Sequence, residues 1–438
     1  MRPPHTTGDQ WTEERAELQL RSLELFGMRF GLDRMRRMMT ALGSPEQRFE
    51  AIQVLGTNGK SSTTRMIAAI LDAHGLRTGS YLSPHLVSYR ERVRIGDREL
   101  EADSFAAAIA RASWAADRVN RTLAEDDHVT QFELLTAAAL WQLEQEGVDV
   151  AVVEAGLGGR YDATSVIDAR VSVLTNVGLE HTRWLGPTIR DIAEEKLARV
   201  APGAALVLGA ELSPAAAAVA ERVAGERGAR ISRAPADGHT PALLARGAFQ
   251  QRNFALARTA AAAYLEVAGV AVSEAAVERA ASAIEVPGRL QLLAGEPPTI
   301  FDGAHNPDAV AALVESLPEV LPPGPLALVL GVLEDKDAAR MLASLLPLCR
   351  RAWFTAPPGD RALPPAALQS LARQLGFDAV DCEPRPERAL DCARSWALQN
   401  GASVLATGSV YLIGDLLSNR RPAARPAALG ILPGSSTR

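Results

Sequence analysis

The sequence predicts an α/β protein made of two units, each with a mostly parallel sheet, the second smaller than the first. Runs that are apolar on both faces, as in buried parallel strands, alternate with helical stretches along most of the chain. This alternation stops at "AGEPPT", residues 294–299, and then restarts. The length of 438 residues also exceeds that of a typical single domain. We expect units over 1–293 and 299–417, followed by a disordered tail over 418–438 that is rich in Pro, Ala and Arg.

The expected elements of the first unit follow in chain order after a frayed start over 1–10. Helices are predicted in "ERAELQLRSLELF", "GLDRMRRMMTALG", "SSTTRMIAAILDAHG", "TQFELLTAAALWQLEQEG", "TIRDIAEEKLARV" and the Ala-rich stretch 254–267. Strands are predicted in "FEAIQVLG", "TGSYL", "VDVAVVEAG", "ARVSVLTNVG" and "AALVLG". A capping box of Thr188 and Asp191 opens the helix in "TIRDIAEEKLARV".

The second unit repeats the same alternation on a smaller scale. Strands are predicted in "IFDGAHN", "LALVLGV", "RAWFTAP", "FDAVD" and "ASVLATGS", and helices are expected to begin at Asp308, Lys336, Pro365 and Pro386. The sequence shows no internal repeat.

Composition narrows the functional classes. The formal net charge of −6 argues against a broad nucleic-acid groove, though it leaves room for a local phosphate pocket. No apolar run is long enough to span a bilayer, and the polar N-terminus lacks a signal core. The three cysteines, Cys349, Cys382 and Cys392, do not have metal-ligand spacing. We therefore expect a cytoplasmic protein that binds small molecules and neither nucleic acid nor membrane.

The stretch "GTNGKSS", Gly56–Ser62, lies between a predicted strand and a predicted helix, which is the setting of a phosphate-binding loop. Its backbone N–H groups can surround a phosphate, and Lys60 can reach the β- and γ-phosphates. A hydroxyl from Ser61 or Ser62 could ligate Mg²⁺. The alternative is an ordinary turn with a solvated lysine, but a strand before the loop and four hydroxyls after Lys60 favour the phosphate loop.

Four polar residues form a candidate metal site: Ser83, His85, Glu154 and His181. Glu154 and His181 lie at or just beyond the carboxyl ends of predicted strands, the edge at which parallel sheets bind ligands. A carboxylate that ends an apolar strand calls for a cationic partner. Magnesium prefers oxygen ligands, so His181 could instead be a hydrogen-bond partner.

Lys196 lies on the apolar stripe of its predicted helix, with Ile189, Ile192, Ala193 and Val200. Snorkelling or an ion pair with a nearby glutamate would explain it. The alternative is a desolvated lysine whose pKa is lowered and which is reactive or modified.

The second unit carries a polar turn after its first strand, with Asp302, His305 and Asn306 in "FDGAHNP". Arg289, just before the break, could reach across a cleft to a phosphate that is being transferred. Asp and Asn also favour turns for local reasons, so a purely structural role stays open. "ATGSVYLIGD" repeats the pattern of a strand followed by Gly and Ser at Ser409.

Taken in order, these motifs resemble the folylpolyglutamate synthase/dihydrofolate synthase family, a branch of the Mur ligase superfamily. The resemblance covers nearly the whole chain and is carried by "FGMRFGLDRMRRMMTALGSP", "VLGTNGKSST", "LSPHLVSYRERVRI", "QFELLTAAAL", "VVEAGLGGRYDAT", "TNVGLEHTRWLG", "EEKLARV", "PGRLQ", "DGAHNP", "EDKD" and "ATGSVYL". It implies a Mur-ligase-like P-loop ATPase domain followed by a Rossmann-like domain, with the active site in the cleft between them. It also implies an ATP-dependent reaction that joins L-glutamate to dihydropteroate, to tetrahydrofolate or to both, through an acyl phosphate.

The resemblance implies a role for each candidate residue. ATP would be bound by Gly56, Thr57, Asn58, Gly59, Lys60, Ser61, Ser62, Asn253, Arg289 and Asp302, and two magnesium ions by Ser62, Ser83, Glu154, His181 and a carbamate on Lys196. The pterin would contact Ser83, Pro84, His85 and Phe132, and glutamate would lie near His305 and Ser409. Lys60, Lys196, Arg289 and His305 would be the catalytic residues, and the family's usual state is a monomer.

Two departures from the family pattern concern the loop and a helix start. Ser61 stands where the family usually has Gly, and Phe249 stands where many members have His. Two other functions stay open. A Mur-type ligase for a cell-wall nucleotide precursor would need a separate N-terminal domain, and only about fifty residues precede Gly56. A nucleotide-dependent binding protein without ligase chemistry would not need Glu154, Lys196 and His305 together.

Overall fold

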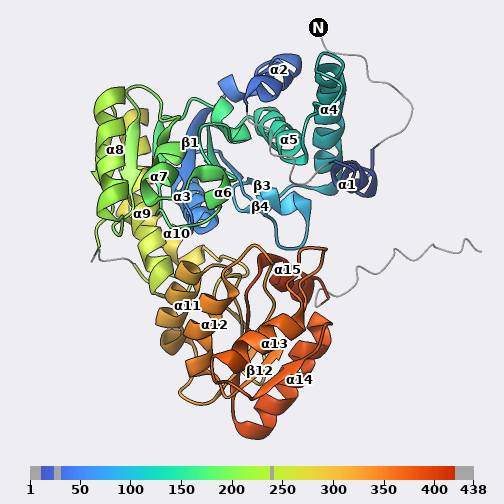
Figure 1. Cartoon of the computed structure of the whole chain (residues 1–438). Coiled ribbons are helices and arrows are strands. Elements are labelled where there is room, and N and C mark those ends of the chain that lie inside the picture. The colour runs from blue at the N-terminus through green and yellow to red at the C-terminus, as the bar shows by residue number, and fades with distance from the viewer. Residues whose placement is uncertain (1–10, 24–30, 237–240, 420–438) are drawn as a thin grey trace, which may run out of the picture.

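The structure is a computed structural model that describes residues 11–23, 31–236 and 241–419. It has two α/β units, stacked one above the other in Figure 1 and built on separate sheets. The predicted fold class is therefore confirmed. The expected frayed start and nearly all of the expected tail lie outside the described residues.

The first sheet has, within the described residues, eight strands in the order β4-β3-β2-β5-β1-β6-β7-β8. They are β1 (Glu50–Leu55), β2 (Thr78–Tyr81), β3 (Val93–Ile95), β4 (Arg98–Glu99), β5 (Val150–Glu154), β6 (Val171–Leu174), β7 (Ala205–Leu208) and β8 (Arg230–Arg233). The run from β2 to β8 is parallel, whereas β3 and β4 form an antiparallel edge. The fully buried strands β5, β6 and β7 explain the continuous apolar runs in the sequence.

Helices cover both faces of this sheet. They are α1 (Glu13–Arg21), α2 (Asp33–Leu42), α3 (Lys60–Ala73), α4 (Ala102–Asn120), α5 (Gln131–Gln145), α6 (Thr182–Leu185), α7 (Ile189–Leu197), α8 (Pro214–Arg227), α9 (Ala248–Ala268) and α10 (Glu274–Ala283). One apolar cluster joins α1, α2, α4 and α5 to Ala51 and Val153 of the sheet. The opposite face packs Ile52 and Val152 against α3, α9 and α10. Helices α7 and α8 pack on the strand ends around Leu55 and Leu174.

The second sheet has six strands in the order β13-β12-β11-β14-β10-β9 across the described chain. Its elements are β9 (Gln291–Leu293), β10 (Thr299–Phe301), α11 (Pro307–Val320), β11 (Leu326–Leu330), α12 (Ala338–Leu345), β12 (Arg351–Phe354), α13 (Pro365–Gln374), β13 (Val380–Cys382), α14 (Pro386–Asn400), β14 (Ser403–Thr407) and α15 (Val410–Ser418). Helices α11, α12 and α13 pack on one face and α14 and α15 on the other.

The second sheet begins earlier than the composition break suggests. Strand β9 pairs antiparallel with β10, with Leu293 opposite Thr299, so residues 291–293 belong to this sheet. We expected these residues in the first unit and the second unit to start at 299. We propose that the limit between the units precedes Gln291.

In the described part of the chain, no helix is long and apolar enough to cross a membrane.

Candidate active site

The phosphate loop lies where β1 ends and α3 begins. Gly59 caps α3 in the left-handed region, with φ 79°, and Lys60 is the first helical residue. The neighbouring strand β6 supports the loop from one side. Its extension donates from Thr175 Oγ1 to the Asn58 carbonyl oxygen at 2.6 Å, and the Asn58 N–H donates to Asn176 Oδ1 at 2.8 Å. The predicted setting of strand, glycine loop and helix is therefore present.

Two glycines of the loop could not carry a side chain. Gly56 has φ 147°, and a Cβ there would lie 1.9 Å from Thr175 Oγ1. A Cβ at Gly59 would lie 2.6 Å from Oδ1 of Asn253, whose side chain comes from α9 and donates to Gln250. Gly59 is thus enclosed by a residue that we expected at the nucleotide. Ser61, by contrast, is a helical residue with ordinary geometry, so a side chain is tolerated where the family usually has Gly.

Glu154 lies beside the phosphate loop, between Ser61 and Ser83. It ends β5 with an exposed fraction of 1 %. Its carboxylate accepts from the Ser61 hydroxyl at 3.0 Å and from the Ser83 N–H at 3.0 Å. Burial raises the pKa of Glu154, and the charge of Lys60 and these hydrogen bonds only partly oppose that effect. A buried carboxylate with this arrangement is a suitable ligand for a cation.

Lys196 is fully desolvated, as its place on the apolar stripe of α7 suggested. It is 4 % exposed, and its Nζ donates to the carbonyl oxygens of Gly56 at 2.8 Å and Leu157 at 3.3 Å. Burial, aided by the charge of Lys60, lowers the pKa of Lys196 to about 7. Among the described residues, no carboxylate lies within ion-pair distance of Nζ, so the alternative of an ion pair with a glutamate is wrong.

His181 is the N-cap residue directly before the short helix α6 and lies in the left-handed region, with φ 53°. Burial lowers the pKa of His181 to about 4, and the charges of Lys336, Lys60 and Lys196 act in the same direction against that of Glu180. The imidazole is therefore neutral near pH 7, the form in which histidine binds metals.

The structure brings part of the predicted metal set together. Ser61, rather than Ser62, is the hydroxyl that reaches Glu154, and Ser83 reaches it through its backbone. Nowhere in residues 11–23, 31–236 or 241–419 do three or more His, Cys, Asp or Glu side chains form a cluster that could hold a metal ion. A magnesium ion here would therefore depend on hydroxyl, water and phosphate oxygens, as Mg²⁺ commonly does at nucleotide sites.

The polar turn of the second unit is built around Asp302, which is 2 % exposed. Its carboxylate accepts from the N–H groups of Leu290 and Ala304, both at 2.8 Å. Burial raises the pKa of Asp302 despite the nearby charge of Arg289. The charge of Arg289 also acts on Glu154 of the first unit. Arg289 thus lies between the two units, where a clamp for a transferring phosphate would have to be.

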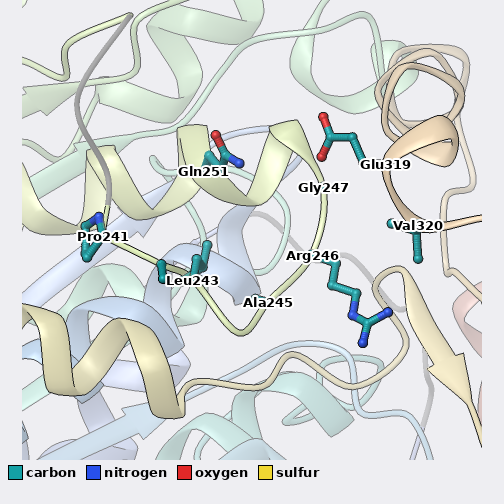
Figure 2. A pocket seen from close by; sticks show the side chains of 9 residues that line it. Pro241, Leu243, Ala245, Arg246, Gly247, Gln251, Glu319 and Val320 are labelled. Atoms are coloured by element: carbon teal, nitrogen blue, oxygen red, sulfur yellow. The ribbon is translucent and has the colours of Figure 1, made fainter.

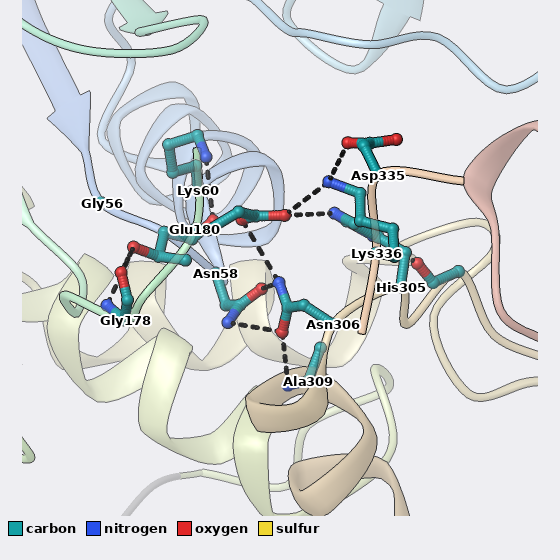
Figure 3. Close-up of polar contacts among 12 residues, drawn as sticks. Gly56, Asn58, Lys60, Gly178, Glu180, His305, Asn306, Ala309, Asp335 and Lys336 are labelled. Carbon is teal, nitrogen blue, oxygen red and sulfur yellow. Dashed lines mark hydrogen bonds and ion pairs between the residues drawn. The ribbon is translucent and has the colours of Figure 1, made fainter. Parts of the chain in front are cut away.

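The two units meet at the phosphate loop (Figure 3). The side-chain amides of Asn58 and Asn306 pair in both directions, at 2.9 and 3.3 Å. Asn306 also caps α11 by accepting from the Ala309 N–H at 2.8 Å. The turn that carries His305 is therefore fixed directly against the loop expected to hold ATP.

A second contact between the units is ionic and nearly buried. Glu180 of the first unit accepts from Lys336 Nζ at 2.9 Å and lies 3.5 Å from His305 Nε2 (Figure 3). Burial alone would raise the pKa of Glu180, but His305 and Lys336 together hold it well below its usual range. The Glu180 side chain is 11 % exposed and that of Lys336 9 %. We call Glu180, His305 and Lys336 the interunit triad.

Sequence reasoning assigned no role to Glu180 or Lys336. Both lie within quoted motifs, "TNVGLEHTRWLG" and "EDKD", beside residues that drew attention for other reasons. Asn306 was noted only as a turn residue. The sequence carried one signal of a site here, a titratable residue just beyond the carboxyl end of a predicted strand. This signal applied to Glu180 as well as to His181.

The remaining predicted residues have definite local partners. His85 Nδ1 accepts from Arg92 Nε at 3.1 Å, and burial lowers the pKa of His85 to about 3. Phe132, on α5, packs against Gly156, with its ring centroid 6.3 Å from that of Tyr81. Ser409 is buried and caps α15 by accepting from the Tyr411 N–H at 3.2 Å. Pro84 follows Ser83 in the same loop, across a cis peptide bond.

A cavity of about 380 Å³ also lies between the units (Figure 2). It is lined by the segment before α9, by Gln251 on α9, and by Glu319 and Val320 at the end of α11. None of the predicted site residues lines it.

Comparison with known proteins agrees with this geometry. Residues 54–202 match the Mur ligase middle domain, and residues 288–410 match the Mur ligase glutamate ligase domain. The dihydrofolate synthase/folylpolyglutamate synthase of Escherichia coli is 34% identical over 88% of this chain and 90% of its own length. The chain belongs to the folylpolyglutamate synthase/dihydrofolate synthase family. Members of this family are acid–amino-acid ligases of the Mur ligase superfamily.

Solved structures show the same fold. Folylpolyglutamate synthase of Mycobacterium tuberculosis, complexed with ADP and AMPPCP, superposes with a TM-score of 0.86 at 30% identity, covering 94% of this chain and 100% of that one. E. coli FolC in complex with DHPP and ADP gives a TM-score of 0.80 at 29% identity, covering 95% of this chain and 99% of that one.

The chain spans about half the length of some curated relatives. The probable bifunctional folylpolyglutamate synthase/dihydropteroate synthase of Haloferax volcanii is 34% identical over 90% of this chain but only 49% of its own length.

Proposed function

We propose that this protein uses ATP to join L-glutamate to the carboxylate of dihydropteroate, of a reduced folate, or of both. The observation that carries the proposal is the contact of the phosphate loop with the turn of the glutamate ligase domain, through Asn58 and Asn306. In the proposed complex, the γ-phosphate of ATP would lie on the side of the loop that faces His305. The family supplies the substrate class, since relatives are named for both activities.

The reaction has two steps. A carboxylate oxygen of the pterin substrate attacks the γ-phosphorus of ATP, giving an acyl phosphate and releasing ADP. The amine of L-glutamate then attacks the acyl carbon, loses a proton, and expels phosphate to leave an amide. Lys60 and Arg289 would stabilise the charge on the transferring phosphoryl group from opposite units. Contact between the units would exclude water that could hydrolyse the acyl phosphate.

Magnesium fits the residues around Glu154, where a buried carboxylate and the Ser61 and Ser83 groups gather beside the loop. The ion would be held by Glu154, by the neutral His181, and by the hydroxyls of Ser83 and of either Ser61 or Ser62. When bound, the ion would neutralise charge on the ATP phosphates.

The carbamate on Lys196 is also part of the proposal. At a pKa of about 7 a large share of the amine is unprotonated near neutrality and can add to CO₂. The product would be an anion in place of a buried cation, which suits a second magnesium ion beside the loop.

The pterin would bind beside Phe132 and the loop Ser83–Leu86, with the glutamate near His305 and Ser409. Asn253 and Asp302 would border the nucleotide. We further propose a cytoplasmic monomer. The three cysteines, which are unpaired in the structure, suit a reducing compartment.

Phosphate release from the purified protein with ATP and Mg²⁺ tests the proposal. Reactions with dihydropteroate plus glutamate and with tetrahydrofolate plus glutamate are compared, and products are identified by mass. Release with both, each with one glutamate added, would establish a bifunctional enzyme. Release with one would assign a single activity, and release with neither would reject the proposed function.

A further inference from the structure

A buried ion pair joins α2 to the start of α5, on the face of the first sheet opposite α3. Arg34 Nε donates to both carboxylate oxygens of Glu133, at 3.0 and 3.1 Å, and Nη1 donates to Asp127 Oδ1 at 3.0 Å. Arg34 and Glu133 are each 6% exposed. This arginine therefore connects α2 both to α5 and to the loop that leads into α5.

The first turn of α5 has further fixed contacts. The carboxylate of Glu133 accepts from the Thr130 N–H at 2.9 Å and from the Thr130 hydroxyl at 3.0 Å, which closes a capping box. Gln131, which is 4% exposed, donates from Nε2 to the Leu20 carbonyl oxygen of α1 at 2.8 Å. Phe132 lies between these two fixed residues. The rotation of the first turn, and with it the direction of the Phe132 side chain, is thus set by contacts with α1 and α2.

A capping box does not by itself call for a buried arginine. Helix α7 begins with a similar box, Thr188 and Asp191, which is exposed, and in the described part of the chain Asp191 has no ion-pair partner. A buried ion pair also adds little net stability compared with apolar packing, and its best attested role is to fix one arrangement of the elements that it joins. The pair of Arg34 and Glu133 is therefore better explained by the geometry of this turn than by the stability of α5.

The geometry of the turn matters because the Phe132 ring is closely packed. A Cβ at Gly156 would lie 2.6 Å from Cζ of this ring, so the ring rests against the backbone just beyond Glu154. Its centroid lies 6.3 Å from that of Tyr81, whose hydroxyl is 3.1 Å from the hydroxyl of Thr136 on α5. The ring is thus at the carboxyl edge of the sheet, where ligands bind in such folds. A rotation of α5 would move the ring out of this place.

We propose that Arg34 is a positioning residue for the pterin substrate. Through Glu133 it fixes the first turn of α5, and it thereby holds the Phe132 ring in the orientation that the pterin requires. The proposal rests on the proposed function, which puts the pterin beside Phe132. Arg34 acts through these two residues and not by contact with the substrate.

Steady-state kinetics on the full chain test the proposal. Arg34→Met should raise the KM for the pterin substrate about fivefold or more and change the KM for ATP less than about twofold, since only the pterin contacts α5. Glu133→Gln should act in the same way, because an amide can keep the capping box but cannot form the ion pair. Arg34→Lys should restore part of the effect, since lysine keeps the charge but not both hydrogen bonds. Arg65→Met is the matched control. It removes an arginine whose side chain is 10% exposed from its pair with Asp97 on the opposite face of the sheet, and it should lower the melting temperature without changing the KM for the pterin.

A double-mutant cycle separates positioning from a general loss of structure. In a Phe132→Ala background, Arg34→Met should leave the KM for the pterin unchanged, because the ring through which Arg34 acts is gone. Pterin binding is also measured by isothermal titration calorimetry with ADP and Mg²⁺ present, so that the effect can be read without turnover. If Arg34→Met does not fold, the same cycle is run with Arg34→Lys or Glu133→Gln.

Two results would overturn the proposal. One is an unchanged KM for the pterin in the folded variants of Arg34 and Glu133. The other is the same fold-change in the unmodified and the Phe132→Ala backgrounds, which would show that Arg34 does not act through the ring. Either result with an active unmodified chain rejects this proposal alone. An unmodified chain that neither binds nor ligates a pterin would reject the proposed function, and this proposal with it.

Discussion

Burial controls the charge of single residues around the phosphate loop. Burial favours the neutral form of Glu154, Lys196 and His181. It raises the pKa of the acid Glu154 and lowers the pKa values of the bases Lys196 and His181. Negative charge and its counterions reach these three groups only when a nucleotide binds to the phosphate loop. We infer that the pKa values of these three residues suit a site that also holds a cation and a phosphate, which the protein chain itself does not supply.

Lys196 should make stability depend on pH in a predictable direction. Its pKa falls from 10.5 to about 7 on folding, so between these values the unfolded chain binds more protons than the folded one. Stability relative to a Lys196→Met variant should therefore rise with pH across this window, by about 1 kcal/mol per pH unit, and be independent of pH below it. Urea denaturation of both proteins in CO₂-free buffer between pH 6 and about 10 measures the difference. Parallel pH curves for the two proteins would contradict the lowered pKa.

Lys196→Ala should abolish ligation while the fold persists. The side chain is proposed to carry the anion that holds a second magnesium ion. Among the described residues, its hydrogen-bond partners are two carbonyl oxygens, those of Gly56 and Leu157. Turnover is measured beside the circular dichroism spectrum and the melting temperature. A folded variant with near-normal turnover would reject the carbamate.

His305→Ala should raise the KM for glutamate more than the KM for ATP. The imidazole Nδ1 donates to the Gly303 carbonyl oxygen at 2.9 Å, which leaves Nε2 directed at the interunit contact rather than into the phosphate loop. We expect at least about a tenfold larger effect on glutamate. Replacing the exposed His128 by Ala is the control. An equal loss for both substrates would argue against the glutamate role.

At the scale of elements, the phosphate loop depends on close packing against β6 as well as on glycine's freedom. Gly56 and Gly75 both have φ in the left-handed half of the map, at 147° and 87°. A Cβ at Gly75 would meet nothing within 4 Å, whereas one at Gly56 would strike the Thr175 side chain. Alanine at position 75 therefore measures the cost of the backbone conformation alone, and alanine at position 56 measures that cost together with the cost of the collision.

Gly75→Ala should lower stability by about 1 kcal/mol and leave ATP affinity unchanged. Gly56→Ala should lower stability further and weaken ATP binding by at least about tenfold, since either the loop or Thr175 must move. Thermal unfolding and nucleotide titration measure the two effects. Equal behaviour of both variants would show that packing against β6 does not shape the loop.

Elements with strong local signals were predictable from the sequence. The box of Thr188 and Asp191 caps α7 as expected, with the Asp191 N–H donating to Thr188 Oγ1 at 3.2 Å. The buried place of Lys196 followed from spacing alone. No element was assigned to residues 102–120, although Phe105, Ile109 and Ala112 recur at helical spacing in what is the 19-residue helix α4. Strand β9 was missed because three residues carry no readable period and its partner β10 lies beyond two prolines.

At the scale of the whole molecule, the site is a property of the interface. Glu154 and Lys196 could be picked out because their own elements make them anomalous. Glu180 and Lys336 could not, because a charged residue in a loop is ordinary until another unit covers it. Their pairing spans 156 positions of sequence and depends on how two separate sheets are placed, which no local pattern reports.

The interunit triad should hold the two units together before nucleotide binds. Glu180 receives Lys336, His305 and Asn306, all from the second unit, and the Glu180–Lys336 pair is about nine-tenths buried. Removing either partner breaks this buried pair, but Lys336 keeps Asp335 at 3.2 Å and Glu180 keeps His305 and Asn306. The cost should therefore be below the ~3–5 kcal/mol of a buried charge left with no partner. Lys336→Met and Glu180→Gln should therefore each increase the radius of gyration in small-angle X-ray scattering of the nucleotide-free protein. Glu266→Gln, which breaks the exposed pair with Arg230, should not.

The double variant should be no more open than either single one, because the same contact is lost in all three. Scattering curves that match the unmodified protein would mean that the other contacts between the units, among them the Asn58–Asn306 pair, the Arg252–Glu315 ion pair and the packing of Leu86, are enough to hold the units in place.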